Sequence, residues 1–304
     1  MRPLRLLLGT AQWGWTTSAR EAYELLDNWL KAGHSEIDAA TNYPINRQPE
    51  DFRAAERILQ DYVRAHGLKN ELRITMKVGS VNNLRTPEIN LEPSFIMMMA
   101  EEYHRILGEC LSGIMVHWDN RAEAPAIRDT CSALQYIAQN GIRPGLSGIL
   151  HPDLYAGALE GAFSLDIELK HNALVSDYPR YHALTQSGQH QVLAYGINAG
   201  GVKLSGQYAD DSTFTVRGGN TEVWEQRLKL IEDERARWNT AFTRPPVVTM
   251  NHVGLIFAGL HPGMHGIVVG AKHPGQIQET LDYIANLYTF DYRDVFGALN
   301  KMVS

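Results

Sequence analysis

Cysteine is almost absent from this chain of 304 residues, which contains only Cys110 and Cys131. Two cysteines cannot form a disulfide framework, and their scarcity is typical of proteins in a reducing compartment. The apolar run near the N-terminus stops at Gly9 and is too short for the hydrophobic region of a signal peptide. No segment reaches the ~18 continuous apolar residues of a membrane-spanning helix. We therefore expect a cytoplasmic protein that does not interact with membranes.

Positive charge is also in short supply. The chain has 28 Lys and Arg against 34 Asp and Glu, which gives a formal net charge of -6. No run of basic residues is long enough to follow a phosphate backbone, so we expect no nucleic-acid partner. His261 and His265 have the spacing of a helical zinc motif, but Pro262 and Gly263 between them would break the helix. We expect a loop there and no metal site.

The glycine fingerprint G-x-G-x-x-G, which binds dinucleotides in open α/β sheets, does not follow the first apolar run. The chain contains instead a series of short apolar runs whose length and boundaries indicate buried strands. There are eight of them: residues 5–10, 35–38, 72–78, 114–117, 145–147, 163–169, 191–195 and 266–270.

Segments that indicate helices lie between and after these runs. They are residues 18–31, 53–66, 93–107, 122–139, 152–159, 181–187, 222–238, 247–259 and 274–287. Short apolar strands that alternate with helices predict a parallel sheet. Eight such units in about 300 residues close most economically into a barrel. We predict one (β/α)8 TIM barrel domain over residues 1–304, a parallel eight-stranded barrel with outer helices, with an open doubly wound sheet as the alternative.

Ionisable side chains stand at the ends of three consecutive strands. Asp38, Lys77 and His117 close the second, third and fourth apolar runs, and Tyr43 follows the second. Reactive groups of parallel barrels lie at the carboxyl ends of the strands, and neighbouring strands are about 4.8 Å apart. We therefore expect these four side chains to meet in one small acid/base site.

Each of the four also has an ordinary structural interpretation. Asp38 can cap a turn, and Tyr43 can be a half-buried loop aromatic. Lys77 can be a solvated lysine at a strand end, and His117 a buried histidine with its hydrogen bonds satisfied. Their occurrence in this order at successive strand ends favours the catalytic interpretation.

Short segments spread over nearly the whole chain resemble the aldo-keto reductase family, in the order of that family. They are residues 9–14 (GTAQWG), 37–43 (IDAATNY), 76–78 (MKV), 116–118 (VHW), 194–196 (AYG) with Gly200 and Gly201, and 268–271 (VVGA) with 276–279 (QIQE). The resemblance implies interconversion of a carbonyl with its alcohol by a nicotinamide cofactor.

The chemistry of carbonyl reduction explains the four residue types. The carbonyl carbon receives a hydride and its oxygen a proton, and the phenol of Tyr43, with an ordinary pKa near 10, is the proton donor. We expect Lys77 to lower that pKa, and Asp38 to keep Lys77 charged and oriented. A neutral His117 can donate a hydrogen bond to the carbonyl oxygen.

The resemblance also implies an extended cofactor, NADP(H), with NAD(H) as a second possibility. Thr10, Ala11 and Asp38 would border the nicotinamide, Ser147 would contact its carboxamide, and Tyr195 would stack on its ring. The adenosine end would be held by Gly270, Ala271, Lys272, Gln276, Glu279 and Thr280. The start of the last predicted helix also suits a phosphate, because helix amino ends attract anions.

The chain departs from the family at several positions. Gly148 stands where an Asn is frequent, Glu168 where a Gln is usual, and Gln276 where an Arg often binds the 2′-phosphate. Lys272 offers a positive charge nearby. The loop after Tyr43 is longer than in the common family pattern, so the family does not predict the substrate.

Aromatic residues suggest the character of the substrate pocket. Trp13 and Trp118, together with Tyr43, predict aromatic walls that suit a small carbonyl compound, either a sugar or an aryl aldehyde. Two other functions remain open. One is a nicotinamide-binding barrel with a mainly regulatory or interaction role, suggested by Gly148 and Glu168. The other is a hydrolytic or isomerising barrel enzyme that uses no nicotinamide.

Overall fold

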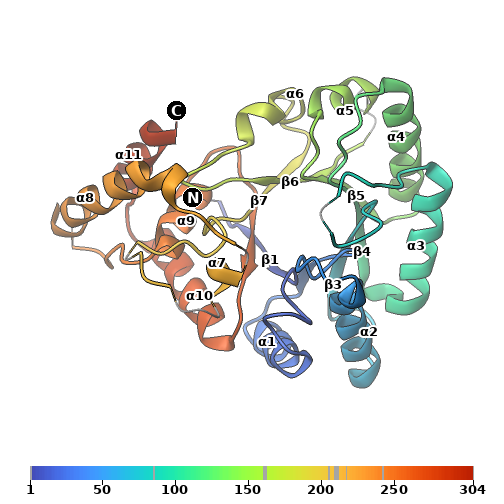
Figure 1. Cartoon of the computed structure of the whole chain (residues 1–304), viewed down its shortest axis with the longest axis horizontal. Coiled ribbons are helices and arrows are strands. Elements are labelled where there is room, and N and C mark those ends of the chain that lie inside the picture. Colours follow the sequence, from blue (N-terminus) through green and yellow to red (C-terminus); the bar gives the residue numbers. More distant parts are fainter. Residues whose placement is uncertain are drawn as a thin grey trace.

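The fold is a closed barrel of eight parallel strands, each pairing with the next in the chain and β8 pairing with β1 (Figure 1). The computed structural model describes residues 2–84, 86–159, 163–204, 206–208, 212–216, 218–241 and 243–303. The strands are β1 (Arg5–Gly9), β2 (Glu36–Ala40), β3 (Arg73–Val78), β4 (Leu111–His117), β5 (Arg143–Ser147), β6 (Asp166–Lys170), β7 (Gln191–Tyr195) and β8 (Gly266–Gly270). This confirms the predicted (β/α)8 barrel and excludes the open sheet.

Helices surround the strands, and α8 and α11 extend from one side of the barrel (Figure 1). The α-helices are α1 (Ala19–Lys31), α2 (Ala54–His66), α3 (Pro93–Leu107), α4 (Ala124–Gln139), α5 (Pro152–Leu159), α6 (His182–Thr185), α7 (Thr213–Val216), α8 (Glu225–Ala241), α9 (Met250–Gly259), α10 (Pro274–Thr289) and α11 (Arg293–Val303). Short 3-10 turns are η1 (Pro49–Asp51), η2 (Gly108–Cys110), η3 (Tyr178–Tyr181) and η4 (Glu222–Trp224). In the described part of the chain no helix is both long and apolar enough to cross a membrane.

Local sequence signals explain where several helices begin and end. Ser18 caps α1 with a reciprocal capping box, because its hydroxyl accepts from the Glu21 N–H and the Glu21 carboxylate accepts from the Ser18 N–H. Gly67 ends α2 in the left-handed conformation, with a φ of 60°. Two α-helices were not predicted: α7, within the glycine-rich segment after β7, and the C-terminal α11.

The apolar core has two parts. The larger part fills the space between the strands and the outer helices. A small separate cluster of Leu7, Met115, Leu193 and Val268 comes from four strands and packs against Tyr195. Because side chains alternate between the two faces of a strand, these residues point into the barrel and fill its middle. Polar groups at the two ends of the strands are therefore separated by an apolar layer.

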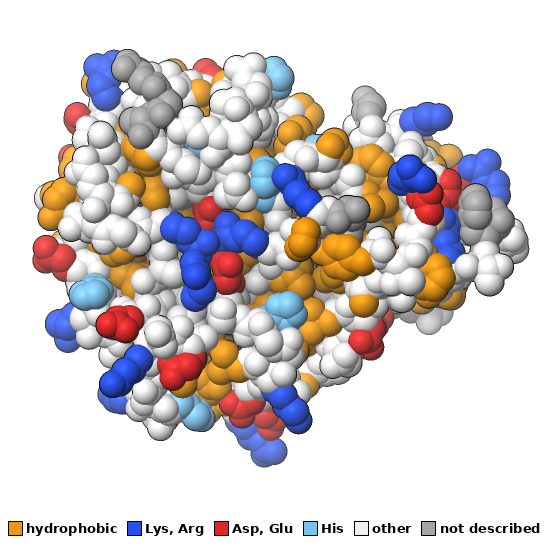
Figure 2. Space-filling model, turned by 180° about the vertical axis from the view of Figure 1, so that it is seen from behind, with side chains coloured by type: hydrophobic (Ala, Val, Ile, Leu, Met, Phe, Trp, Pro, Cys, Tyr) orange, Lys and Arg blue, Asp and Glu red, His pale blue; other side chains and the backbone are white. Residues whose placement is uncertain are grey.

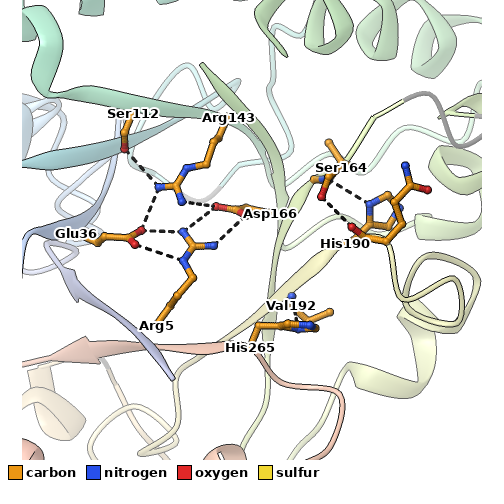
Figure 3. A network of polar contacts seen from close by, with 11 residues as sticks. Arg5, Glu36, Ser112, Arg143, Ser164, Asp166, His190, Val192 and His265 are labelled. Atoms are coloured by element: carbon orange, nitrogen blue, oxygen red, sulfur yellow. Dashed lines mark hydrogen bonds and ion pairs between the residues drawn. The ribbon is translucent and has the colours of Figure 1, made fainter. Parts of the chain in front are cut away.

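The amino ends of the strands carry a network of four charged residues, each the first residue of its strand (Figure 3). Arg5 binds Glu36 at 2.7 Å and Asp166 at 3.0 Å, and Arg143 binds Glu36 at 3.0 Å. Two guanidinium groups thus match two carboxylates. On the back face of the molecule, basic and acidic side chains gather near the middle (Figure 2). The network of Arg5, Glu36, Arg143 and Asp166 links β1, β2, β5 and β6 at the end of the barrel opposite the predicted site.

Candidate active site

The four predicted acid/base residues lie on or just after three neighbouring strands, although β2 continues two residues beyond Asp38. Asp38 is in β2, Lys77 is next to the last residue of β3, and His117 ends β4. Tyr43 follows β2 after a short turn. All four are buried, with exposed fractions between 2% and 7%. The structure brings them together, as the sequence predicts.

Lys77 lies at the centre of this group. Its ammonium donates to the carboxylate of Asp38, and to Glu168 Oε2 at 3.2 Å. Burial alone would lower the pKa of Lys77, but the charges of Asp38 and Glu168 outweigh it and raise that pKa well above the ordinary value. Lys77 is therefore a fixed positive charge held by two carboxyl groups.

Two carboxyl groups share this single ammonium. Burial and the nearby charge of Glu168 raise the pKa of Asp38 to about 8, although Lys77 acts in the opposite direction. The cause is that a buried cluster with one excess negative charge is costly in a medium that solvates ions poorly.

Tyr43 lies next to both Lys77 and His117. The Lys77 Nζ is 5.1 Å from the centre of the Tyr43 ring. The centre of the His117 ring is 5.9 Å from that of Tyr43, and the two rings meet edge to face at 86°. A small carbonyl group above the phenol can therefore be within reach of both the hydroxyl and the imidazole.

Burial determines the protonation states of these two rings. It raises the pKa of Tyr43 to about 12, because it outweighs the lowering effect of Lys77. Lys77 acts in the expected direction and lowers the pKa of Tyr43, but the larger effect of burial makes the net shift upward. Burial, with the charge of Lys77, also lowers the pKa of His117 well below its ordinary value, so the imidazole is neutral. Both rings carry a proton available for hydrogen bonding.

Ser147 and Glu168 continue the site across β5 and β6. His117, Ser147 and Glu168 lie in register across three adjacent strands. The Ser147 hydroxyl donates to Glu168 Oε2 at 3.0 Å. Glu168 Oε1 and His117 Nδ1 have no hydrogen-bond partner among the described residues. The sequence marked Glu168 as a departure from the family but did not predict its contact with Lys77.

The packing around position 148 explains why this residue has no side chain. Gly148 has a φ of +62°, and a Cβ there would be 2.7 Å from the Trp118 ring and 3.3 Å from the Tyr195 hydroxyl. Trp118 packs on His117 with ring centres 4.5 Å apart. The indole therefore occupies the space beside the strand ends that an Asn side chain at position 148 would need.

The residues predicted for the cofactor surround the ends of β1, β7 and β8. Gly9 pairs with Gly270, so Thr10 and Ala11 adjoin the loop that starts at Gly270. Gln276 Oε1 accepts from the Lys272 N–H at 2.8 Å. Glu279 and Thr280 lie in the second turn of α10, where Thr280 is buried and Glu279 is exposed. Ala271 and Tyr195 adjoin the barrel mouth.

The two predicted pocket tryptophans differ in position. Trp13 is fully buried in the main core, whereas Trp118 is only partly buried.

Asn42, which was not predicted, is buried beside Tyr43, and its side-chain amide has no hydrogen-bond partner in the described residues. The sequence signal for Asn42 is its position directly before the predicted Tyr43, just after a strand end.

No cluster of three or more His, Cys, Asp or Glu in the described residues is arranged to hold a metal ion. His261 and His265 instead form loop hydrogen bonds. The Gly263 N–H donates to His261 Nδ1 at 3.1 Å, and the Val192 N–H donates to His265 Nδ1 at 3.1 Å.

A parallel barrel with ionisable groups at its strand ends is the architecture of many enzymes. The model of the aldo/keto reductase family matches residues 5–296, and the chain belongs to this family. Membership implies carbonyl reduction with a nicotinamide cofactor.

Among solved structures, "aldo-keto reductase AKR11C1 from Bacillus halodurans (holo form)" is similar in fold. Its TM-score is 0.73 at 16% identity, over 100% of this chain and 96% of that chain. No curated protein matches the chain in sequence.

Proposed function

We propose that this protein is an NAD(P)H-dependent oxidoreductase that interconverts an aldehyde or ketone with its alcohol, with Tyr43 as the general acid and base. The observation that supports this most strongly is the meeting of Tyr43, Lys77 and His117 in one buried site. Family membership supports the reaction class.

The residues present fit a nicotinamide cofactor. Glu168 Oε1 and the Asn42 amide are buried polar groups that lack a partner in the described residues. Tyr195 offers a partly exposed ring at the barrel mouth. The first N–H groups of α10 have no side-chain cap and suit a phosphate. We propose that Thr10, Ala11, Asp38, Ser147 and Tyr195 hold the nicotinamide end, and Gly270, Ala271, Lys272, Gln276, Glu279 and Thr280 the adenosine end.

A reduced nicotinamide held by these residues would supply a hydride to the carbonyl carbon. Tyr43 donates its proton to the carbonyl oxygen, and its pKa of about 12 keeps that proton in place at neutral pH. Neutral His117 donates a hydrogen bond to the same oxygen and fixes its direction. Lys77 stabilises the phenolate that Tyr43 leaves behind, until a proton from solvent restores the phenol.

The choice between NADP(H) and NAD(H) and the class of substrate are inferred from weaker features. Lys272 supports NADP(H), while Gln276, which offers no charge for a 2′-phosphate, leaves NAD(H) open. Partly buried Trp118 beside His117 supports a substrate with an apolar or sugar ring face. We propose a sugar or an aryl aldehyde.

Fluorescence titration with NADPH and NADH tests the cofactor directly. A barrel enzyme that uses no nicotinamide would bind neither, and this result would overturn the proposal. Turnover of a panel of sugars and aromatic aldehydes then tests the reaction. We expect cofactor oxidation that depends on at least one class of carbonyl compound.

The alternative is a nicotinamide-binding barrel with a mainly regulatory or interaction role. One observation favours it: Glu168 competes for the ammonium of Lys77, which a phenolate at Tyr43 also requires. Tight nicotinamide binding with no turnover of any carbonyl in the panel would support this alternative. The complete and buried set of four residues favours the enzyme.

A further inference from the structure

Glu168 is a fully buried carboxylate whose hydrogen bonding is incomplete. Ser147 Oγ and Lys77 Nζ both donate to its Oε2. Its Oε1 has no donor among the described residues. A buried acceptor without a donor is costly, so this oxygen is suited to accept a hydrogen bond from a bound molecule.

The ionisable groups around Glu168 come from several strands of the barrel. Asp38 and Lys77 lie on β2 and β3, His117 on β4, and Tyr195 on β7, with the Tyr43 phenol above β2. Both phenols and the imidazole are neutral at neutral pH, because burial raises the pKa of each tyrosine and lowers that of His117. The ionisable cluster therefore consists of one ammonium and two carboxyl groups.

We propose that Glu168 binds the nicotinamide end of the cofactor and favours its oxidised form over its reduced form. This inference rests on the proposed function. The oxidised nicotinamide ring carries a positive charge and the reduced ring carries none, so a nearby buried carboxylate attracts only the oxidised ring. The carboxamide N–H of either form can donate to Glu168 Oε1. A neutral side chain of the same shape would accept that hydrogen bond without distinguishing the two forms.

The preference has a chemical consequence. When an enzyme binds the oxidised cofactor more tightly than the reduced one, the bound reduced cofactor becomes a stronger hydride donor. Two electrons leave it with the hydride for the carbonyl carbon, and the proton of Tyr43 goes to the oxygen. Glu168 thereby favours the direction that produces the alcohol on the enzyme.

The cluster reaches its full negative charge above the raised pKa of Asp38, about 8. A carboxyl group with a raised pKa gains its charge only as the pH rises through that value. The test is therefore made at about pH 9, where the charge of the Asp38 carboxylate adds to the attraction for the oxidised ring.

The experiment measures separate dissociation constants for NADP+ and NADPH, or for NAD+ and NADH if the wild type binds that couple. The quantity compared is the ratio of the oxidised to the reduced constant. Glu168→Gln keeps the volume and the acceptor but removes the charge, and the ratio should rise about tenfold. For a two-electron couple, a tenfold change corresponds to about 30 mV in the potential of the bound cofactor.

Three further variants separate charge from packing. Glu168→Met removes both charge and acceptor, so it should raise the ratio similarly while weakening the binding of both forms. Glu168→Asp keeps the charge, and its ratio should stay within about threefold of the wild type. Asp166→Asn is the matched control: Asp166 lies two residues earlier on β6 and faces the same interior, but it pairs with Arg5 and Arg143. It should leave the ratio unchanged.

A rise of threefold or more in either neutral variant supports the inference. A smaller change in both, in protein that binds both forms, overturns it. If the wild type reduces carbonyls but the ratio of dissociation constants is the same in the neutral variants, only the inference about Glu168 fails. If the wild type binds neither nicotinamide couple, the proposed function fails as well.

Discussion

At the scale of single residues, the ammonium of Lys77 connects three groups that would otherwise act independently. It contacts Asp38 and Glu168 and lies close to the Tyr43 ring. Its charge favours a phenolate, whereas burial and the two carboxyl groups favour the neutral phenol. The neutral phenol prevails, which suits proton donation better than proton removal.

The protonation state of Tyr43 predicts different pH dependences for the two reaction directions. Carbonyl reduction requires the phenol, so its kcat/KM should vary by less than about twofold between about pH 6 and 7.5. Protonation of His117 does not lower kcat/KM in this range, because burial and the charge of Lys77 hold its pKa well below the ordinary value. Alcohol oxidation requires the phenolate, whose fraction rises about tenfold per pH unit below the Tyr43 pKa of about 12.

Steady-state kinetics in both directions check this prediction. Alcohol oxidation should rise with pH at a logarithmic slope close to one. A flat profile for oxidation, or a steep fall in reduction within this range, would show that another group controls the proton.

At the scale of elements, the position of Tyr195 depends on how α9 packs against the segment after β7. A Cβ at Gly254 in α9 would lie 2.4 Å from the backbone oxygen of Ile197, two residues after Tyr195. Since a backbone atom cannot move aside as a side chain can, the segment itself must shift.

Gly254→Ala should therefore weaken nicotinamide binding and lower the free energy of unfolding by about 1–3 kcal/mol. Gly157→Ala in α5 is the matched control, because nothing lies within 4 Å of its Cβ position. That control should be neutral or stabilising by about 0.5–1 kcal/mol, since Ala favours a helix. Urea unfolding and cofactor titration measure both quantities, and equal effects of the two substitutions would refute the packing argument.

At the scale of the whole molecule, the charged network and the candidate active site lie at opposite ends of the barrel. The network links four strands at their amino ends. Asp166 links β6 to Arg5 of β1 and Arg143 of β5. Its side chain is only 6% exposed, so removal of its charge leaves two guanidinium groups with one carboxylate, that of Glu36.

Asp166→Asn should lower the free energy of unfolding by about 2 kcal/mol, because a largely buried ion pair is broken on one side. The kcat/KM should change little, since the network lies at the opposite end of the strands. Asp61→Asn, which removes an exposed ion pair with Arg64, should change stability by less than about 0.5 kcal/mol. Similar losses in both variants would show that the network does not stabilise the barrel.

Much of the fold could be predicted from the sequence, because its signals are local. Apolar runs placed all eight strands, and their ends placed Asp38, Lys77 and His117 at one end of the barrel. The amphipathic α11 was missed, although Val295 and Leu299 have the spacing of one helix face and are buried.

The rest depended on the folded chain. The contact between Glu168 and Lys77 requires the register of four strands, β3 to β6, which no local pattern encodes. The net shift of the Tyr43 pKa could not be predicted from the sequence, because burial is a property of the folded chain and outweighs the lowering effect of Lys77. The crowding at Gly148 likewise comes from Trp118 and Tyr195, which lie on other strand ends.

The measurement that tests the account most directly is the turnover of Tyr43→Phe with a carbonyl substrate of the wild type. The substitution removes one hydroxyl and keeps the ring. We predict a loss of about 10²–10⁴ in kcat, as expected for the loss of a general acid, with cofactor dissociation constants within about threefold of the wild type. Carbonyl reduction by Tyr43→Phe at the rate of the wild type would contradict the account.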